Sequence, residues 1–336
     1  MDIFDVLELL LGLSLFLFGM NIMGDSLREM AEKGLRNILE RLTSSRIRGV
    51  FLGALVTAVI QSSSATTVMV VGFVNSGVMA LSAAVGVIMG ANVGTAFTSW
   101  ITALSGIEGG EAVGTVLVWF KPSSFTPLLA LAGIILYTVG NGNKKRNIAL
   151  ILLGFSVLML GMDNMSDSVE GLSNNEGFRA IFTAFENPIL GLLGGLAVTA
   201  IVQSSSASIG ILQSFTATGA ITFGNAVPII MGQNIGTCIT ALLASVGTNK
   251  NAKRASAIHL FFNLFGSVIG LTVFYILKYA IRPDFLGGKI DMWGIAATHT
   301  AFNLLTAAVL FPTSSLLERC AAWMIREKGR HLNKGK

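Results

Sequence analysis

The sequence predicts an all-α polytopic membrane protein, made of two inverted-topology repeats that contain re-entrant or discontinuous helices. Three observations predict this fold class: an apolar composition, apolar stretches of bilayer-spanning length, and a polar motif that returns at a fixed offset. Of the 336 residues, 52% are hydrophobic and 12% are charged, and the mean hydropathy is +0.71. So few charged side chains cannot cover a water-soluble globule of this size. We therefore expect a multi-pass protein of the cell membrane, with the lipid bilayer as its solvent.

Apolar stretches approach the roughly 20 residues that a helix needs to cross a bilayer. They span residues 7–23, 50–74, 78–104, 123–140, 148–162, 188–217, 220–246, 256–281 and 293–312. Several contain polar breaks, so their number does not set the number of crossings. The first stretch is preceded by Asp2, Asp5 and Glu8 instead of lysine or arginine, and no small-residue cleavage site follows it. This pattern predicts a first transmembrane helix and not a removable signal peptide.

One polar motif occurs twice. The segment Thr57-Ala-Val-Ile-Gln-Ser-Ser-Ser-Ala65 returns as Thr199-Ala-Ile-Val-Gln-Ser-Ser-Ser-Ala207, at an offset of 199 − 57 = 142. The same offset relates Gly90-Ala-Asn-Val-Gly-Thr95 to Gly232-Gln-Asn-Ile-Gly-Thr237. Without a gap, 17 of the 39 positions of 57–95 are identical in 199–237. Because the register holds through polar residues as well as apolar ones, the sequence predicts an internal duplication.

The charges between the apolar stretches predict that the two copies are inverted. Residues 28–48 hold six lysines and arginines against three acids, whereas residues 163–186 hold five acids against Arg179 alone. Positive charge concentrates on the cytoplasmic side, so the first segment is expected inside and the second outside. The same rule puts the N-terminus outside and the C-terminus in the cytoplasm. The predicted organisation is repeat 1 over 1–140, repeat 2 with additional helices over 141–317, and a basic cytoplasmic tail over 318–336.

Each Gln-Ser-Ser-Ser segment sets an amide and several hydroxyls inside an apolar stretch. Such side chains compete for local backbone partners, and non-helical backbone survives at membrane depth only where it lines a cavity or is buried in protein. The segments therefore favour a helix break or a re-entrant tip. Hydroxyl, amide and carbonyl oxygens suit an alkali cation, and the N–H groups that begin the next half-helix suit an oxyanion. A cation together with an anion fits better than either alone.

Packing is the alternative role for these segments, because small residues let helices approach closely and hydrogen-bond. Each copy, however, is followed 31 residues later by Asn92 or Asn234 (92 − 61 = 234 − 203 = 31), and this second match favours a site. The glycines four apart in the later segments, Gly90 with Gly94 and Gly232 with Gly236, can form a close-packing face. That role is compatible with lining a site.

Two histidines form a lesser pattern, His259 with Asn263 and His299 with Asn303, each pair four residues apart on one helical face. We expect packing and hydrogen bonding between helices, with a proton or substrate role as the alternative. The apolar stretches hold almost no acids, which disfavours a carboxylate-based proton pump. A nucleotide loop ending in Gly-Lys-Ser/Thr does not occur, so direct ATP drive has no support.

The remaining composition excludes other classes. The formal charge of +5 comes from short loops and the C-terminal tail, so it predicts orientation in a membrane and no nucleic-acid partner. The two cysteines, Cys238 and Cys320, are too few for a disulfide framework or a thiolate metal site. We expect no cofactor and no transition metal. A homodimer is compatible with the sequence.

The paired motifs resemble those of the sodium/phosphate cotransporter family, the bacterial relatives of the animal type II sodium-dependent phosphate cotransporters. Inverted repeats that each carry Gln-Ser-Ser-Ser are that family's hallmark, and the resemblance covers most of residues 7–312. It implies sodium-driven uptake of inorganic phosphate across the bacterial inner (plasma) membrane. On this basis we expect the serines to bind phosphate and the amides and threonines to bind sodium. The expected phosphate ligands are Ser62, Ser63, Ser64, Ser204, Ser205 and Ser206, and the expected sodium ligands are Gln61, Asn92, Thr95, Gln203, Asn234 and Thr237.

The resulting hypothesis is a secondary active transporter, not an enzyme, which moves sodium inward together with phosphate by alternating access. Bound sodium would offset the charge of the phosphate, because no lysine or arginine within the apolar stretches clearly does so. Three alternatives stay open: a sodium-coupled transporter of another oxyanion, an uncoupled ion or anion channel, and an intramembrane serine hydrolase that uses His259 or His299 as its base.

Overall fold

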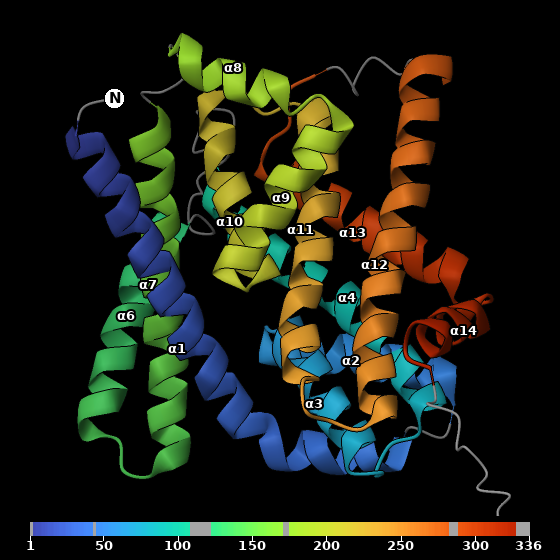
Figure 1. Ribbon diagram of the computed structural model, residues 1–336. Coiled ribbons are helices and arrows are strands. Elements are labelled where there is room, and N and C mark those ends of the chain that lie inside the picture. The colour runs from blue at the N-terminus through green and yellow to red at the C-terminus, as the bar shows by residue number, and fades with distance from the viewer. Residues whose placement is uncertain (1–2, 43–44, 108–121, 171–174, 282–287, 327–336) are drawn as a thin grey trace, which may run out of the picture.

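A computed structural model describes residues 3–42, 45–107, 122–170, 175–281 and 288–326. Within these ranges every regular element is a helix, and a single isolated bridge joins Thr222 to Lys289. The all-α prediction is confirmed for the described part of the chain (Figure 1). The helices are α1 (Ile3–Leu42), α2 (Arg46–Ile60), α3 (Ser63–Asn75), α4 (Leu81–Ala103), α6 (Pro122–Val139), α7 (Asn143–Glu170), α8 (Glu176–Ala184), α9 (Pro188–Val202), α10 (Ser205–Ser214), α11 (Phe223–Ala244), α12 (Lys250–Ile276), α13 (Met292–Leu310) and α14 (Ser314–Met324).

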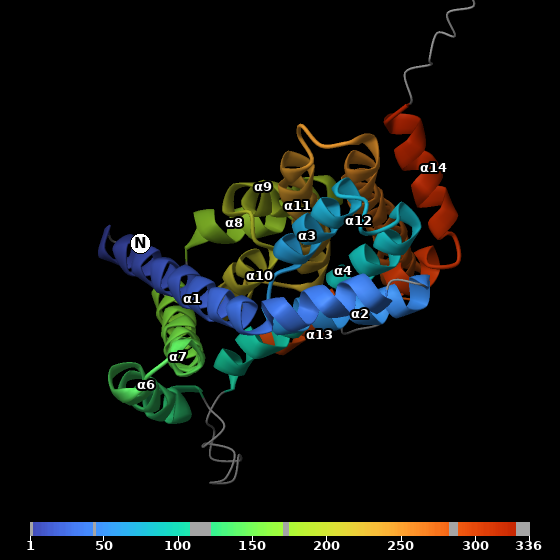
Figure 2. The ribbon, with the colours of Figure 1, turned by 90° about the horizontal axis from the view of Figure 1, so that it is seen from below.

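Seven helices among the described residues are long and apolar enough to cross a bilayer. They are α1, α4, α6, α7, α11, α12 and α13, whereas α3 and α9 are apolar but shorter. Helix α6 lies beside α7 at the edge of the molecule (Figure 2), and Leu128, Leu131 and Ile135 expose more than half of their side chains there. A polypeptide in water would bury such a face, so this surface agrees with a multi-pass protein that is solvated by lipid.

The first helix is longer than its apolar stretch. Residues 28–48 follow the first apolar stretch, 7–23, and α1 continues into them as far as Leu42. Arginine, glutamate and lysine, which are frequent between Arg28 and Leu42, are good helix formers. The extension therefore adds a polar section to the same rigid helix that spans the apolar stretch.

Helices α1 and α7 pack against each other through glycines. A Cβ added to Gly12 would lie 2.8 Å from the backbone nitrogen of Met165, and one added to Gly154 would lie 2.8 Å from that of Met23. Gly19 and Gly161 meet the backbone of the opposite helix in the same way. The offset of 142 relates Gly12 to Gly154 and Gly19 to Gly161. The contact is therefore made by equivalent residues of the two copies, and it needs the absence of a side chain.

The pairs α2 with α4 and α9 with α11 show the same kind of contact. Gly94 lies against Thr57, and Gly236, its equivalent, would bring a Cβ within 2.7 Å of the Leu196 carbonyl oxygen. Gly90 and Gly232 press against the carbonyl oxygens of Val50 and Leu192. The close-packing role predicted for these glycines is confirmed, and it fixes the two Gln-Ser-Ser-Ser segments against long helices.

Gly53→Ala is expected to destabilise the α2–α4 pair, because the new Cβ would collide with the carbonyl oxygen of Val87. Overpacking of this kind costs about 1–3 kcal/mol. The matched control is Gly72→Ala, since no atom lies within 4 Å of a Cβ there and alanine is the better helix former. Thermal unfolding of the purified protein in detergent should show a lower midpoint for Gly53→Ala only. Equal midpoints for the two variants would contradict this account.

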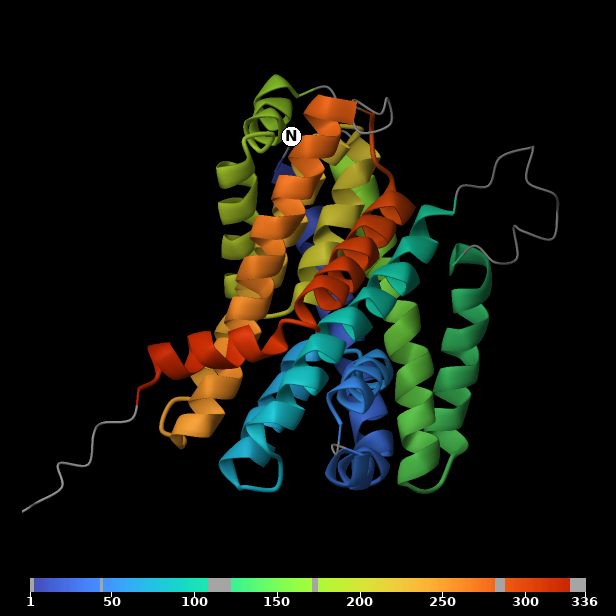
Figure 3. The same cartoon turned by 90° about the vertical axis from the view of Figure 1, so that its right-hand side faces the viewer.

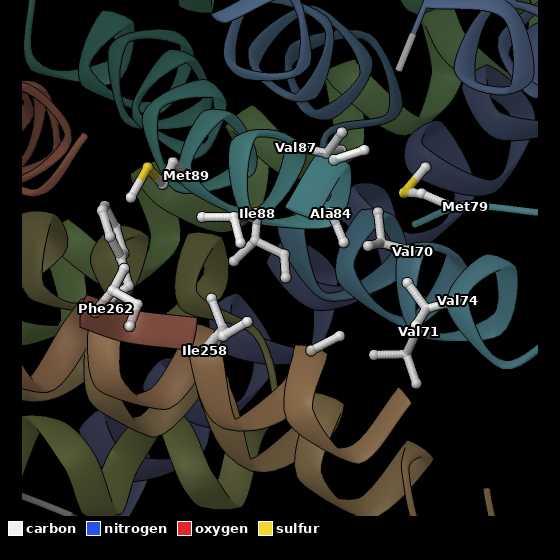
Figure 4. Packing of buried hydrophobic residues seen from close by; sticks show 14 of the residues in the cluster. Val70, Val71, Val74, Met79, Ala84, Val87, Ile88, Met89, Ile258 and Phe262 are labelled. Carbon is white, nitrogen blue, oxygen red and sulfur yellow. The ribbon is translucent and has the colours of Figure 1, made fainter. Parts of the chain in front are cut away.

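The largest apolar core joins the first copy to the later helices. Val70, Val74, Ile88, Ile258 and Phe262 are buried together where α3, α4 and α12 meet (Figure 4). Helix α13 runs alongside α4 (Figure 3), and Trp100 donates a hydrogen bond to Thr300 at 2.8 Å between them. This core holds the first Gln-Ser-Ser-Ser segment against the later helices.

The predicted basic tail begins inside a helix. Helix α14 runs to Met324, buries Leu317 and Ala321, and packs against α12. Glu318 forms an ion pair with Arg46 at the start of α2, with 2.5 Å between Oε1 and Nη2. Residues 327–336 of the predicted tail lie outside the described residues. The described part of this segment is therefore attached to the helical bundle.

Candidate functional site

Both Gln-Ser-Ser-Ser segments break a helix at the glutamine. Helix α2 ends at Ile60 and α3 begins at Ser63, while α9 ends at Val202 and α10 begins at Ser205. Gln61 has φ 60° and Gln203 has φ 57°, and they are the only residues other than glycine with positive φ in the described part of the chain. L-residues rarely adopt this left-handed conformation, and strained backbone concentrates at functional sites. The helix breaks predicted from the motif are thus present at equivalent residues.

The second residue of each motif caps the helix that follows. The Ser62 hydroxyl accepts a hydrogen bond from the Ala65 N–H at 3.1 Å, and the Ser204 hydroxyl accepts one from the Ala207 N–H at 3.2 Å. Each cap satisfies the N–H of the third helical residue. The N–H groups of the first two residues of each short helix have no acceptor inside the helix. These groups carry the positive end of the helix dipole, so each break offers donors to an anion.

The two breaks meet. The hydroxyl oxygens of Ser63 and Ser205 lie 3.5 Å apart, although the residues are 142 positions apart in the chain, and both side chains are only 4% exposed. They border a cavity of about 190 Å³, which we call the serine cavity. Its lining comprises Met20, Asn21, Gly24, Asp25 and Arg28 of α1, Ile60–Ser64, and Val202–Ser206. All six serines expected to bind phosphate and both glutamines thus line one cavity, and two helix N-termini converge on it.

Two buried oxygens that lack a hydrogen-bond partner among the described residues lie near the C-terminal ends of α2 and α9. Gln61 is 7% exposed and donates its Nε2 to the Ala58 carbonyl, while its buried Oε1 has no hydrogen-bond partner among the described residues. The Thr199 hydroxyl, one turn before Gln203, is also buried and unpartnered. Its equivalent Thr57 instead donates to Thr66 at 3.0 Å. A buried oxygen that no donor reaches is costly, and a bound cation would satisfy it.

The second set of expected ligands lies elsewhere. Asn92, Thr95, Asn234 and Thr237 are each 3% exposed in α4 and α11 and are not among the residues that line the cavity. Their side chains donate to carbonyls one turn earlier in their own helices, at 2.9–3.0 Å. Their expected role in binding sodium stays a prediction. The groups of aspartate, glutamate, histidine and cysteine that commonly hold a metal are not found in the described residues.

Sequence reasoning missed the contribution of α1. Asn21, Gly24, Asp25 and Arg28 have the spacing i, i+3, i+4 and i+7, which sets them on one face of a helix. The sequence places Arg28 beyond the first apolar stretch, and the prediction considered only lysines and arginines within such stretches as a source of charge for the site. Because α1 continues past the apolar stretch, Arg28 instead borders the cavity. The polar stripe was the signal that could have found it.

The two histidines lie away from this chemistry. His259 and His299 are fully buried in α12 and α13, and none of their ring nitrogens has a hydrogen-bond partner among the described residues. Neither forms the serine contact that a hydrolase requires. The structure therefore gives the serine hydrolase alternative no support at these residues.

Comparison with known protein families shows which family the chain belongs to. A model of the Na⁺/Pi-cotransporter family matches the chain twice, over residues 15–167 and 158–280. The chain belongs to the Na⁺/Pi-cotransporter family. The resemblance seen in the motifs is therefore confirmed.

Curated relatives come from bacteria and from animals. The uncharacterized protein YqeW of Bacillus subtilis is 29% identical over 93% of this chain and 96% of its own length. The putative inorganic phosphate export protein YjbB of Escherichia coli is 26% identical over 96% of this chain, which spans only 56% of YjbB. The human sodium-dependent phosphate transport protein 2B is 36% identical over 37% of this chain and 19% of its own length. No solved structure matches the chain.

Proposed function

We propose that this chain is a secondary active transporter that couples the inward movement of sodium to the uptake of inorganic phosphate. The observation that carries the proposal is the pair of broken helices whose serine hydroxyls and N-termini meet at one cavity. A tetrahedral oxyanion needs several donors that converge from different directions, and this arrangement supplies them. Family membership and the phosphate-transport names of two relatives support phosphate as the substrate.

Sodium as the coupling ion is supported by the neutral oxygens near the breaks. The unpartnered Gln61 Oε1 and Thr199 Oγ1 are hard, uncharged ligands of the kind that suit an alkali cation. A cation bound there would also lower the cost of holding phosphate in a low-dielectric site. Ordered binding, with sodium before phosphate, follows from that electrostatic dependence.

Alternating access by two inverted repeats is supported by equivalent contacts and by a second cavity. One family model matches two successive segments, and the same offset relates the glycines of α1 to those of α7. Asn21, Gly24 and Asp25 border the serine cavity, whereas their equivalents Asp163, Ser166 and Asp167 border a separate cavity of about 770 Å³. In a rocking transporter, equivalent faces of the two repeats open in turn to opposite sides.

The proposed orientation has the N-terminus outside and the C-terminus in the cytoplasm. Helices α7 and α12 begin at the lower end in Figure 1, where Lys144, Arg146, Lys250 and Arg254 lie near their first turns. The acidic residues Asp163, Asp167 and Glu170 lie toward the other end of α7. This distribution supports a cytoplasmic lower end.

Phosphate uptake into proteoliposomes tests the proposal. With an inward sodium gradient, labelled phosphate should rise transiently above its equilibrium level, whereas an equal potassium gradient should give equilibration only. Flux that never exceeds equilibrium would favour a channel. Because YjbB is named as an exporter, vesicles preloaded with phosphate should be tested with sodium gradients of both directions. Phosphate efflux that an inward sodium gradient accelerates would indicate antiport and would contradict uptake by symport.

A further inference from the structure

The serine cavity has two charged residues in its lining, Asp25 and Arg28, one helical turn apart on α1. Arg28 Nη1 lies 3.5 Å from Asp25 Oδ1. The Arg28 side chain is 42% exposed overall, but its Nε is fully buried and has no hydrogen-bond partner among the described residues. The guanidinium thus has one edge held by a carboxylate and one donor directed into protein without an acceptor.

This geometry is a poor source of stability. An exposed ion pair within one helix contributes little, because water and salt screen it and two long side chains must be ordered. A buried N–H without an acceptor is unfavourable, because it loses its hydrogen bond to water. A structural role for the pair therefore leaves the buried Nε unexplained, whereas a turn of the guanidinium toward the cavity would let a ligand oxygen satisfy it.

The chemistry of the cavity identifies that ligand. Ser63, Ser205 and the two helix N-termini supply hydroxyls and partial positive charge, but a phosphate ion in a confined site also calls for a full positive charge. The planar guanidinium can donate from Nε and one Nη to two oxygens of one tetrahedral anion, which a lysine cannot do.

We propose that Arg28 is the cationic ligand of the phosphate bound between the two Gln-Ser-Ser-Ser segments, and that Asp25 holds its guanidinium at the cavity when phosphate is absent. This inference rests on the proposed function. On binding, Arg28 exchanges the Asp25 carboxylate for phosphate oxygens, so the empty site keeps its charge balanced. The residue that supplies the positive charge thus comes from α1 and not from either motif.

Equilibrium binding of labelled phosphate to the purified full-length protein, in saturating sodium, tests the role of Arg28. Arg28→Gln should weaken phosphate binding by at least about tenfold, and Arg28→Lys should weaken it less, because lysine keeps the charge without the paired donors. The matched control is Arg146→Gln, since Arg146 is exposed at the start of α7 and does not line the cavity. Binding by folded Arg28→Gln within twofold of the unmutated protein would overturn the proposal.

Replacing Asp25 should change the phosphate affinity in the opposite direction to replacing Arg28. Asp25→Asn should tighten phosphate binding by about threefold, because it frees the guanidinium and removes a negative charge beside the anion. The exposed neighbour Glu29 provides the control, and Glu29→Gln should leave the affinity unchanged. Weaker binding by Asp25→Asn would contradict the proposed exchange of partners.

A footprint on the unmutated protein avoids any effect of substitution on folding. Phenylglyoxal modifies arginine, and inorganic phosphate should slow its reaction with Arg28 but not with Arg146, as measured by mass spectrometry of peptides. Equal rates at Arg28 with and without phosphate, in protein that binds phosphate, would overturn the role of Arg28 alone. If the unmutated protein binds no phosphate in sodium, the proposed function itself fails, and this inference fails with it.

Discussion

Replacing Ser63 and Ser205 together with alanine is expected to lower sodium-driven phosphate uptake by about 100-fold or more. Each hydroxyl is buried at the cavity, and a hydrogen bond to a charged group contributes about 1.5–3 kcal/mol. The loss of two such bonds corresponds to about 3–6 kcal/mol of binding free energy, or two or more powers of ten in affinity. Initial rates of phosphate uptake into proteoliposomes, measured over a range of phosphate concentrations, provide the test.

Substitutions at Ser63 and Ser205 test phosphate binding with less effect on folding than substitutions at the neighbouring serines. Ser62 and Ser204 cap α3 and α10, so replacing either one also removes a helix cap, which costs about 1 kcal/mol. A double control, Ser76→Ala with Ser315→Ala, changes two exposed serines that do not line the cavity. It should retain full uptake. If the Ser63/Ser205 double variant is folded and transports at the control rate, the cavity is not the phosphate site.

The second large effect concerns the left-handed turn at Gln61. Gln61→Val is expected to prevent stable folding of the α2–α3 break, because a β-branched residue strongly disfavours φ 60°. Gln61→Gly adopts that conformation without strain but loses the amide, including the unpartnered Oε1. We therefore expect the glycine variant to fold normally and to need about tenfold more sodium for half-maximal uptake, a change of about 1.4 kcal/mol.

Thermal unfolding and the sodium dependence of uptake, measured on the same two variants, separate the backbone role from the amide role. Leu131, exposed in the right-handed helix α6, serves as the control position. There the order should reverse, because glycine is a worse helix residue than valine. A Gln61→Val variant that is as stable and as active as Gln61→Gly would show that the site does not require the left-handed turn.

Much of the fold could be predicted from the sequence because it depends on local composition. Apolar stretches predict helices in lipid wherever they occur, and a glutamine followed by three serines weakens a helix from within. The breaks at Gln61 and Gln203 follow from that local chemistry, and the offset of 142 predicted that they would be equivalent. Gly90 and Gly232 likewise indicated close packing before any partner helix was known.

Other features could not be predicted, because they depend on which segments come together. The two stretches 50–74 and 188–217 each became two short helices, and only packing against α4 and α11 fixes the direction of their second halves. Gln61 is buried while its equivalent Gln203 is exposed, so the duplicated sequence has unequal surroundings. Local sequence cannot distinguish equivalent residues whose neighbours come from distant helices.

The sequence by itself determined that this protein is a lipid-solvated helical bundle with a duplicated, helix-breaking motif of amides and hydroxyls. Only the tertiary structure decided that Ser63 and Ser205 lie 3.5 Å apart and that Arg28 borders their cavity. The physical reason is the distance along the sequence over which each kind of interaction acts. Helix breaks arise from side chains that compete with their own backbone over a few residues, whereas a site between repeats is set by glycine contacts between long helices such as α1 and α7.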